Sequence, residues 1–152
     1  MRADLISAFR QQFDEDRLSR FQGGTPFMVA VVTQDPSEPA ALPTSDSWEY
    51  FDTARKIAPT FRNEVTMRSV EMFGEYVPGF YLPSISPTPL MMIVGVHDHL
   101  TPAHIALEAY ETAREPKELV LLDGGHFSAY IEAFDETSSA ATRWFTQHLT
   151  RN

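Results

Sequence analysis

The sequence predicts an α/β fold in which parallel strands are joined by crossover helices and follow a mainly helical segment. Two continuous apolar runs, at residues 90–96 (LMMIVGV) and 119–122 (LVLL), are typical of strands buried on both faces of a parallel sheet. The apolar residues between and after these runs follow a helical spacing. The order strand, helix, strand, helix indicates a crossover unit over residues 87–152. We expect residues 1–86 to form a separate, mostly helical segment.

The first part of that segment is predicted to be an amphipathic helix over residues 2–21, because its apolar residues recur mostly at three- to five-residue steps. Gly23 and Gly24 end it. The apolar run at residues 27–32 (FMVAVV) predicts a strand, and residues 33–43 predict an exposed loop. The expected apolar stripe of the helix consists of Leu5, Ile6, Phe9, Phe13, Leu18 and Phe21.

Two more helices are predicted before the crossover unit. Asp46 followed by Glu49 is a capping-box pattern, which predicts a helix from about residue 47. A second amphipathic pattern predicts a helix over residues 62–76, and the prolines beyond it favour an extended segment. The residues expected on the buried sides of these helices are Trp48, Phe51 and Ile57, then Val65, Met67, Val70, Met72 and Phe73.

Helix signals also follow each strand of the crossover unit. Thr101 as N-cap with Pro102 at the first helical position predicts a helix that continues to about Arg114. After the second strand, a Gly-Gly turn leads into residues 127–149, whose aromatic and apolar residues predict one or two closing helices.

Composition narrows the classes of function. The chain has 152 residues, 12 Lys and Arg against 21 Asp and Glu, a net charge of −9, and no cysteine. The negative charge disfavours nucleic acid and anionic membranes as partners, and the missing cysteine excludes a disulfide framework, a thiolate metal site and a cysteine nucleophile. The longest apolar stretch, at residues 89–96, is far shorter than a bilayer span, and the N-terminus does not resemble a signal peptide. We therefore expect a cytoplasmic location.

Two polar residues follow the predicted parallel strands, where functional side chains gather in open α/β sheets. Asp98 comes directly after the strand at residues 90–96, and His126 follows the Gly-Gly turn after residues 119–122. Parallel strands lie about 4.8 Å apart, so these side chains are able to meet. Asp98 would then orient the imidazole and stabilise its protonated form, which leaves the other ring nitrogen to act as a base. The alternative is that Asp98 caps the next helix and His126 only follows a turn.

Other candidate sites carry weaker signals. A metal site is conceivable, but the histidines match no known zinc spacing, and we expect neither a metal nor an organic cofactor. Trp48, Tyr50, Phe51, Met67 and Met72 are candidates for lining an apolar pocket, although core packing is the more common role for such residues. The acidic run Asp14, Glu15 and Asp16 is expected to be a solvated helix face. The residues considered for the metal site are His97, Asp98, His99, His104 and His126.

Three segments of the chain resemble α/β-hydrolases. The runs PTPLMMIVGVHDHLTP (87–102) and PKELVLLDGGHFSAY (116–130) resemble the acid and base segments near the C-terminus of that superfamily. Residues 61–89 resemble the segment before the acid strand in the bacterial and fungal group that includes polyketide transferases and thiohydrolases. The resemblance implies the C-terminal part of an α/β-hydrolase fold, with residues 1–86 as a helical cap-like segment. It also implies that Asp98 is the triad acid and His126 the general base. The same resemblance implies an acyl pocket lined by apolar residues of the cap-like segment.

The sequence departs from that family at the nucleophile. Hydrolases of this type carry a serine in Gly-x-Ser-x-Gly, ahead of the acid and the histidine, and no serine of these 152 residues has that context. The leading hypothesis is an ester or thioester hydrolase or polyketide transferase that lacks its nucleophile and is truncated. The alternative is a non-catalytic remnant or interaction module that docks through an exposed sheet edge. Expected partners are a small acyl ester or thioester, and either a second copy or a nucleophile-bearing chain.

Overall fold

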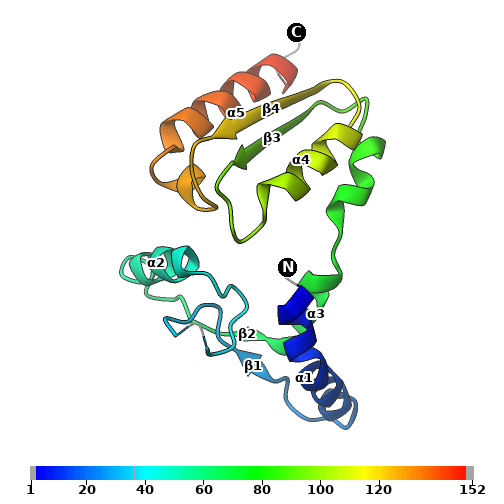
Figure 1. The fold of residues 1–152 in the computed structure, drawn as a ribbon, viewed down its shortest axis with the longest axis vertical. Helices are drawn as coiled ribbons and strands as arrows, with labels where there is room; N and C mark the ends of the chain where they lie inside the picture. The colour runs from blue at the N-terminus through cyan, green and yellow to red at the C-terminus, as the bar shows by residue number, and fades with distance from the viewer. Residues whose placement is uncertain (1–2, 36, 150–152) are drawn as a thin grey trace. The chain divides into compact units, whose positions relative to one another are not determined.

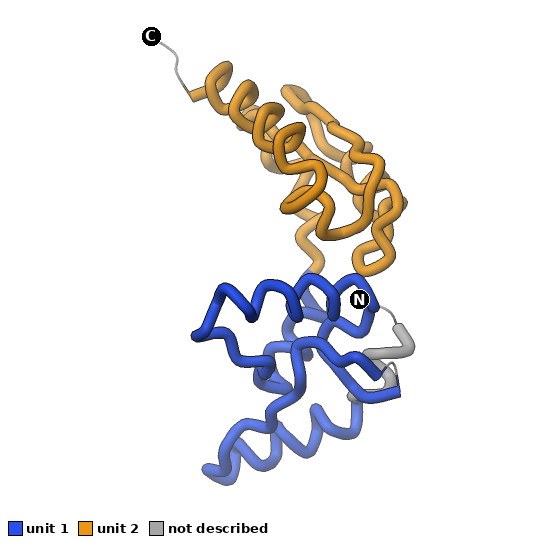
Figure 2. The backbone as a smooth tube through the Cα atoms, turned by 90° about the vertical axis from the view of Figure 1, so that its left-hand side faces the viewer, with its two compact units in different colours: residues 1–76 blue, residues 77–152 orange. Residues whose placement is uncertain are grey.

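The computed structural model describes residues 3–35 and 37–149, and side chains from residue 10 onward. It contains two compact units, Met1–Tyr76 and Val77–Asn152, which Figure 2 colours separately. The side chains of Leu5, Ile6 and Phe9 in the predicted stripe lie outside the described residues, as does residue 2.

Helix α1 (Ala3–Phe21) is the first element of the N-terminal unit. Phe13 is buried as predicted, but Leu18 and Phe21 are 57% and 89% exposed, so the predicted stripe is wrong at these two residues. The glycine stop is confirmed. Gly23 has a φ of +84°, a left-handed conformation that favours glycine, and the Gly24 N–H bonds the carbonyl of Ser19 at 2.8 Å.

The prediction of a solvated acidic face is confirmed at Asp14 and Glu15, which are exposed, and wrong at Asp16, whose side chain is fully buried. Its Oδ1 accepts the backbone N–H of Phe27 and its Oδ2 accepts Arg20 Nε, both at 2.8 Å. Burial by itself raises the pKa of Asp16, but these bonds outweigh it and hold the pKa below its usual range. Asp16 therefore ties the chain after the glycine turn to α1.

A short antiparallel pair follows. Strand β1 (Met28–Val29) pairs with β2 (Val65–Thr66), so the strand predicted over residues 27–32 is shorter than expected. Helix α3 (Met67–Glu75) begins five residues later than predicted, because the residues before it join β2. Thr66 caps α3, and its hydroxyl accepts the N–H of Ser69 at 3.2 Å.

The loop between β1 and α2 is anchored at both ends. Ala30 bridges to Ala40, and the side-chain amide of Asn63 bonds both the N–H and the carbonyl of Val32, at 2.9 and 2.8 Å. Ala40 and Val32 are almost fully buried, so the prediction of an exposed loop is wrong at Ala40.

Helix α2 (Ser45–Ala54) starts earlier than the capping-box pattern indicated. Thr44 is the N-cap residue, and its hydroxyl lies 2.6 Å from that of the buried Ser47. The predicted capping box at Asp46 is therefore wrong, as is the burial of Ile57, which lies past the helix end and is 86% exposed. The core of the N-terminal unit gathers Phe13, Val29, Met67 and Val70. The predicted burial of Phe13, Met67 and Val70 is confirmed, whereas Met72 and Phe73, also predicted to be buried, are exposed.

The C-terminal unit is the predicted crossover unit. Strands β3 and β4 are parallel, in register from Leu90↔Lys117 to Gly95↔Leu122. Figure 1 shows α4 and α5 on opposite sides of the two strands. The elements in order are the 3₁₀ helix η1 (Pro78–Ser84), β3 (Leu90–Gly95), α4 (Ala103–Thr112), β4 (Lys117–Leu122), the 3₁₀ helix η2 (Ser128–Tyr130) and α5 (Phe134–Leu149).

Two details of this unit differ from the sequence prediction. Residues 78–84 form η1 where the prolines predicted an extended chain. Burial of the strands on both faces is also incomplete, because Val94 and Leu122 are 7% and 1% exposed but Leu121 is 51% exposed. In residues 3–35 and 37–149, no helix combines the length and apolarity needed to cross a bilayer.

Candidate active site at the carboxyl ends of the strands

The crossover unit brings Asp98 and His126 together. Asp98 follows β3 and His126 follows β4, and these parallel strands end side by side. The Nδ1 of His126 lies 2.8 Å from Oδ2 of Asp98, which is a hydrogen bond between imidazole and carboxylate. The expected meeting of the two side chains is therefore present, while their catalytic roles stay a prediction.

Gly95 permits this approach. It is the last residue of β3, and the loop carrying His126 passes directly over it: a Cβ at this position would lie 2.7 Å from the carbonyl oxygen of Gly124 and 2.8 Å from that of Gly125. The N–H of His97 bonds the same Gly124 carbonyl at 3.0 Å. Only a residue without a side chain lets the two loops lie this close.

The carboxylate of Asp98 is held by several donors. Its Oδ1 accepts the N–H groups of Leu100 and Thr101 at 2.9 and 2.8 Å, and its Oδ2 accepts the Thr101 hydroxyl at 2.7 Å. Burial raises the pKa of Asp98, but the bonds from Thr101 and His126 outweigh it and lower the pKa below its usual range. Asp98 is thus ionised at neutral pH, and the two alternatives for it are compatible: it holds the backbone ahead of α4 and also bonds His126.

The ionised carboxylate of Asp98, held in this orientation, selects the protonation form of the imidazole. An ionised carboxylate only accepts hydrogen bonds, so His126 carries its proton on Nδ1. Its side chain is 27% exposed, and within the described chain Nε2 has no hydrogen-bond partner. Nε2 therefore offers a lone pair to an incoming group, as a general base must.

Thr101 is a site residue that the sequence placed differently. It was expected to be the N-cap of the next helix, but Pro102 occupies that position and α4 begins at Ala103. The Thr101 hydroxyl instead bonds Asp98 and lies 3.2 Å from Nδ1 of His126. The signal that would have found it is the spacing Asp98-x-x-Thr101, which suits an Asp side chain that turns back onto the following backbone.

A second histidine–aspartate pair lies beside the first. Nε2 of His97 is 3.0 Å from Oδ1 of Asp123, with side chains 67% and 94% exposed. Across residues 3–35 and 37–149, no group of three or more His, Asp or Glu side chains is arranged to hold a metal ion. His97 and His126, two of the histidines considered for a metal site, thus bond different carboxylates.

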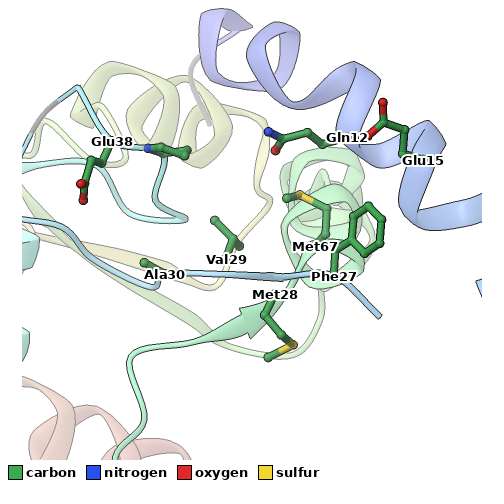
Figure 3. A pocket seen from close by; sticks show the side chains of 9 residues that line it. Gln12, Glu15, Phe27, Met28, Val29, Ala30, Glu38 and Met67 are labelled. Atoms are coloured by element: carbon green, nitrogen blue, oxygen red, sulfur yellow. The ribbon is translucent and has the colours of Figure 1, made fainter. Parts of the chain in front are cut away.

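Of the residues considered for an acyl pocket, Met67 lines a hollow of about 710 Å³ inside the N-terminal unit. Figure 3 shows Met67 and Val29 on one side of β1 and Met28 on the other. Met67 is also a core residue, 4% exposed. A substrate role for it stays a prediction. The hollow is lined by Gln12, Glu15, Phe27, Met28, Val29, Ala30, Glu38, Pro39 and Met67.

Curated proteins named polyketide transferase or thiohydrolase are similar to this chain in sequence. A polyketide transferase, ATR5, of Stachybotrys chlorohalonatus is 30% identical over 117 residues, which are 74% of this chain and 39% of that protein. A thiohydrolase of Eupenicillium brefeldianum is 26% identical over 147 residues, covering 93% of this chain and 48% of its own length. The chain thus spans less than half the length of these curated relatives. No family model matches the sequence.

Solved structures show the same fold. The α/β-hydrolase GrgF from Penicillium sp. sh18 superposes with a TM-score of 0.77 at 21% identity, covering 97% of this chain and 51% of GrgF. The likeness extends over nearly the whole chain, so it includes the crossover unit that carries Asp98 and His126. In fold, the chain is therefore similar to part of an α/β-hydrolase, and in sequence it is similar to polyketide transferases and thiohydrolases.

Proposed function

We propose that Asp98 and His126 are the acid and the base of an acyl-transfer site, in an ester or thioester hydrolase or a polyketide transferase. The observation that carries the proposal is the 2.8 Å bond from His126 Nδ1 to an Asp98 carboxylate that three further hydrogen bonds hold, with Nε2 left open. The names of the relatives support acyl chemistry, and polyketide acyl groups in particular.

The chemistry follows from these protonation states. Nε2 of His126 takes the proton of a serine hydroxyl as its oxygen attacks the acyl carbonyl carbon, and Asp98 stabilises the imidazolium that results. The imidazolium then gives that proton to the departing thiol or alcohol, leaving an acyl-serine. Water or an acceptor alcohol attacks this ester next, with His126 again as the base. The serine must come from a polypeptide segment carrying Gly-x-Ser-x-Gly, which these 152 residues do not contain.

A rate measurement with a short acyl thioester and a p-nitrophenyl ester tests the proposal. The 152-residue chain alone is expected to give the uncatalysed rate. The coding DNA next to this segment shows whether an in-frame sequence with a nucleophile elbow exists, and a protein that includes it is expected to turn over both substrates. In that protein, His126→Ala should lower kcat by about 10⁶-fold and Asp98→Asn by about 10⁴-fold.

Two results would contradict this. Turnover by the longer protein that survives His126→Ala would remove His126 as the base. Hydrolysis by the 152-residue chain that disappears in His126→Ala would show that the chain already contains its nucleophile.

A second candidate function is docking through the edge of the sheet. The N–H groups of Leu90 and Val96 bond carbonyls on the β4 side, those of Pro116 and Leu122. Alternate residues of a parallel strand face opposite edges, so Met91 and Ile93 direct their backbone groups to the other edge of β3. Within the described residues, the sheet has two strands and nothing pairs with that edge. Such an edge is a template for another strand.

Size-exclusion chromatography with light scattering separates this candidate from the enzyme. Docking predicts a defined complex, either with a second copy or with a chain carrying Gly-x-Ser-x-Gly. A well-behaved monomer at high concentration would argue against edge pairing between copies. A complex with a nucleophile-bearing chain that hydrolyses thioesters would instead join the two candidates into one enzyme.

A further inference from the structure

We infer that Thr101 is a positioning residue that selects the Nδ1–H form of His126 by holding its hydroxyl on Asp98. The inference rests on the proposed function for its catalytic meaning, because the selected form is the one that a general base needs. The contacts of Thr101 and the tautomer of His126 can be examined without any catalytic turnover.

The first step is the direction of the Thr101 hydroxyl. A hydroxyl has one hydrogen and two lone pairs, and Oγ1 of Thr101 lies 2.7 Å from Oδ2 of Asp98 and 3.2 Å from Nδ1 of His126. Asp98 is ionised and only accepts, so the single hydrogen points to the carboxylate. A lone pair of the hydroxyl oxygen is then left facing Nδ1.

The imidazole of His126 lies against oxygen atoms of both Asp98 and Thr101. Nδ1 faces two acceptors, the Asp98 oxygen at 2.8 Å and the Thr101 oxygen at 3.2 Å. A proton on Nδ1 can be shared by both oxygens. An unprotonated Nδ1 would instead place its lone pair against the lone pairs of these two oxygens, which is repulsive. The neutral imidazole therefore keeps its proton on Nδ1 and exposes the basic lone pair on Nε2.

Thr101 holds the Asp98 carboxylate through two groups, its hydroxyl and its backbone N–H. Its backbone N–H also bonds Oδ1 of Asp98 at 2.8 Å, so the hydroxyl and the amide hold different oxygens of one carboxylate. This fixes the plane of the carboxylate and directs Oδ2 toward His126. The same bonds are the ones that lower the pKa of Asp98 against its burial. Thr101 thus keeps Asp98 ionised and oriented, and through Asp98 it orients His126.

The test uses the whole chain and nuclear magnetic resonance of the imidazole nitrogens. Long-range ¹H–¹⁵N spectra report which nitrogen of each histidine carries the proton at a pH where the ring is neutral. In the unmodified chain, His126 is expected in the Nδ1–H form. His97 is an internal reference in every sample, because its imidazole bonds Asp123 at 3.0 Å and not the Asp98–Thr101 loop.

Two substitutions isolate the hydroxyl. Thr101→Val keeps the shape and removes the hydroxyl. We expect it to shift His126 toward a mixture of both tautomers and to raise the pKa of Asp98, followed through its carboxyl ¹³C shift. Thr101→Ser keeps the hydroxyl and is expected to retain both properties. A role in packing alone would not be restored by serine, which lacks the methyl group.

Three results would overturn the inference. The first is an Nε2–H form of His126 in the unmodified chain, which needs no variant to fold. The second is a folded Thr101→Val protein that keeps both the tautomer and the Asp98 titration. The third is a Thr101→Ser protein that loses them. Failure of the proposed function is separate, because it would appear as absent thioester turnover in the longer protein while the His126 spectra stay as expected.

Discussion

The carboxyl ends of β3 and β4 carry two histidine–aspartate pairs that differ in what surrounds each carboxylate. Asp98 and His126 are 10% and 27% exposed, and Asp98 accepts three further hydrogen bonds from its own loop. Asp123 and His97 are 94% and 67% exposed. The bond lengths, 2.8 and 3.0 Å, are almost the same.

Bond length therefore does not separate a candidate site from a surface contact. An exposed ion pair contributes about 0–1 kcal/mol, because water screens it and ordering two side chains has an entropic cost. A shielded carboxylate with fixed donors orients its partner. The comparison indicates that loop geometry, which holds Asp98 and shelters His126, distinguishes the candidate site.

The largest expected effect comes from separating the two loops. Gly95→Ala would place a Cβ against the carbonyl oxygens of Gly124 and Gly125, which belong to backbone and have no flexible end to move. Alanine normally gains about 0.5–1 kcal/mol over glycine in a strand, but overpacking costs about 1–3 kcal/mol. Separation of the loops also breaks the Asp98–His126 bond, which contributes about 1.5–3 kcal/mol as a hydrogen bond to a charged group. The net effect is therefore a larger loss of stability than removal of that bond alone. Urea unfolding should show this loss, and the His126 spectrum should lose its Nδ1–H preference.

Gly79→Ala is the matched control for that variant. A Cβ at Gly79 meets one atom, the Cβ of Ala109, at 3.4 Å, which is ordinary contact. We expect its stability and His126 spectrum to stay close to those of the unmodified chain. Equal stability of Gly95→Ala and the unmodified chain would contradict the role assigned to Gly95.

Asp98→Asn and Asp123→Asn remove the charge from one carboxylate of each pair, and the next largest effect is expected for Asp98. Asp98→Asn keeps the size but places an amide beside Nδ1, which removes the charge and favours the wrong tautomer of His126. We expect a loss of about 1.5–3 kcal/mol, typical of hydrogen bonds to a charged group. Asp123→Asn is expected to change neither stability nor the His126 tautomer measurably. Chemical denaturation with paired imidazole spectra measures both variants, and equal losses would abolish the distinction between the two pairs.

The stabilisation that Asp98 contributes should depend on pH. The pKa of Asp98 is lower in the folded chain than its unfolded value of about 3.9, so the unfolded chain binds more protons in that range. The stabilisation is thus complete above about pH 4 and is lost as the pH falls through the folded-state pKa. The stability difference between the unmodified chain and Asp98→Asn should shrink on acidification. The pKa of the buried Asp16 is also lowered, but equally in both proteins, so its contribution cancels in the difference between their stabilities. A difference that stays constant would contradict this.

The sequence predicted the crossover unit because its signals are local and strong. Unbroken apolar runs at 90–96 and 119–122 mark β3 and β4 within a few residues, and the parallel arrangement then brings Asp98 and His126 to one edge. Thr101 was missed as a site residue because a helix N-cap and a carboxylate partner use the same residue type at nearly the same position. Only the fold shows which of the two its hydroxyl bonds.

The N-terminal unit was predicted less well because its local signals compete with tertiary contacts. The sequence predicted Asp16 to be solvated, but the backbone N–H of Phe27, 11 residues further along the chain, bonds its carboxylate. Residues 62–66 fit a helical period, yet β2 forms there because β1 offers a pairing partner. Neither contact is visible in a window of neighbouring residues.

The smallest change in stability and in the His126 tautomer is expected when the exposed His97–Asp123 pair is removed. His97→Gln removes the imidazole facing Asp123 but leaves the His97 backbone N–H, which bonds Gly124 and helps to hold the loop carrying His126. If the candidate site depends on backbone geometry, then stability and the His126 tautomer should both stay within error of the unmodified chain. Thermal unfolding and the ¹H–¹⁵N spectrum check this. A shift of the His126 tautomer would mean that the two pairs act as one network, and the exposed pair would then belong to the site.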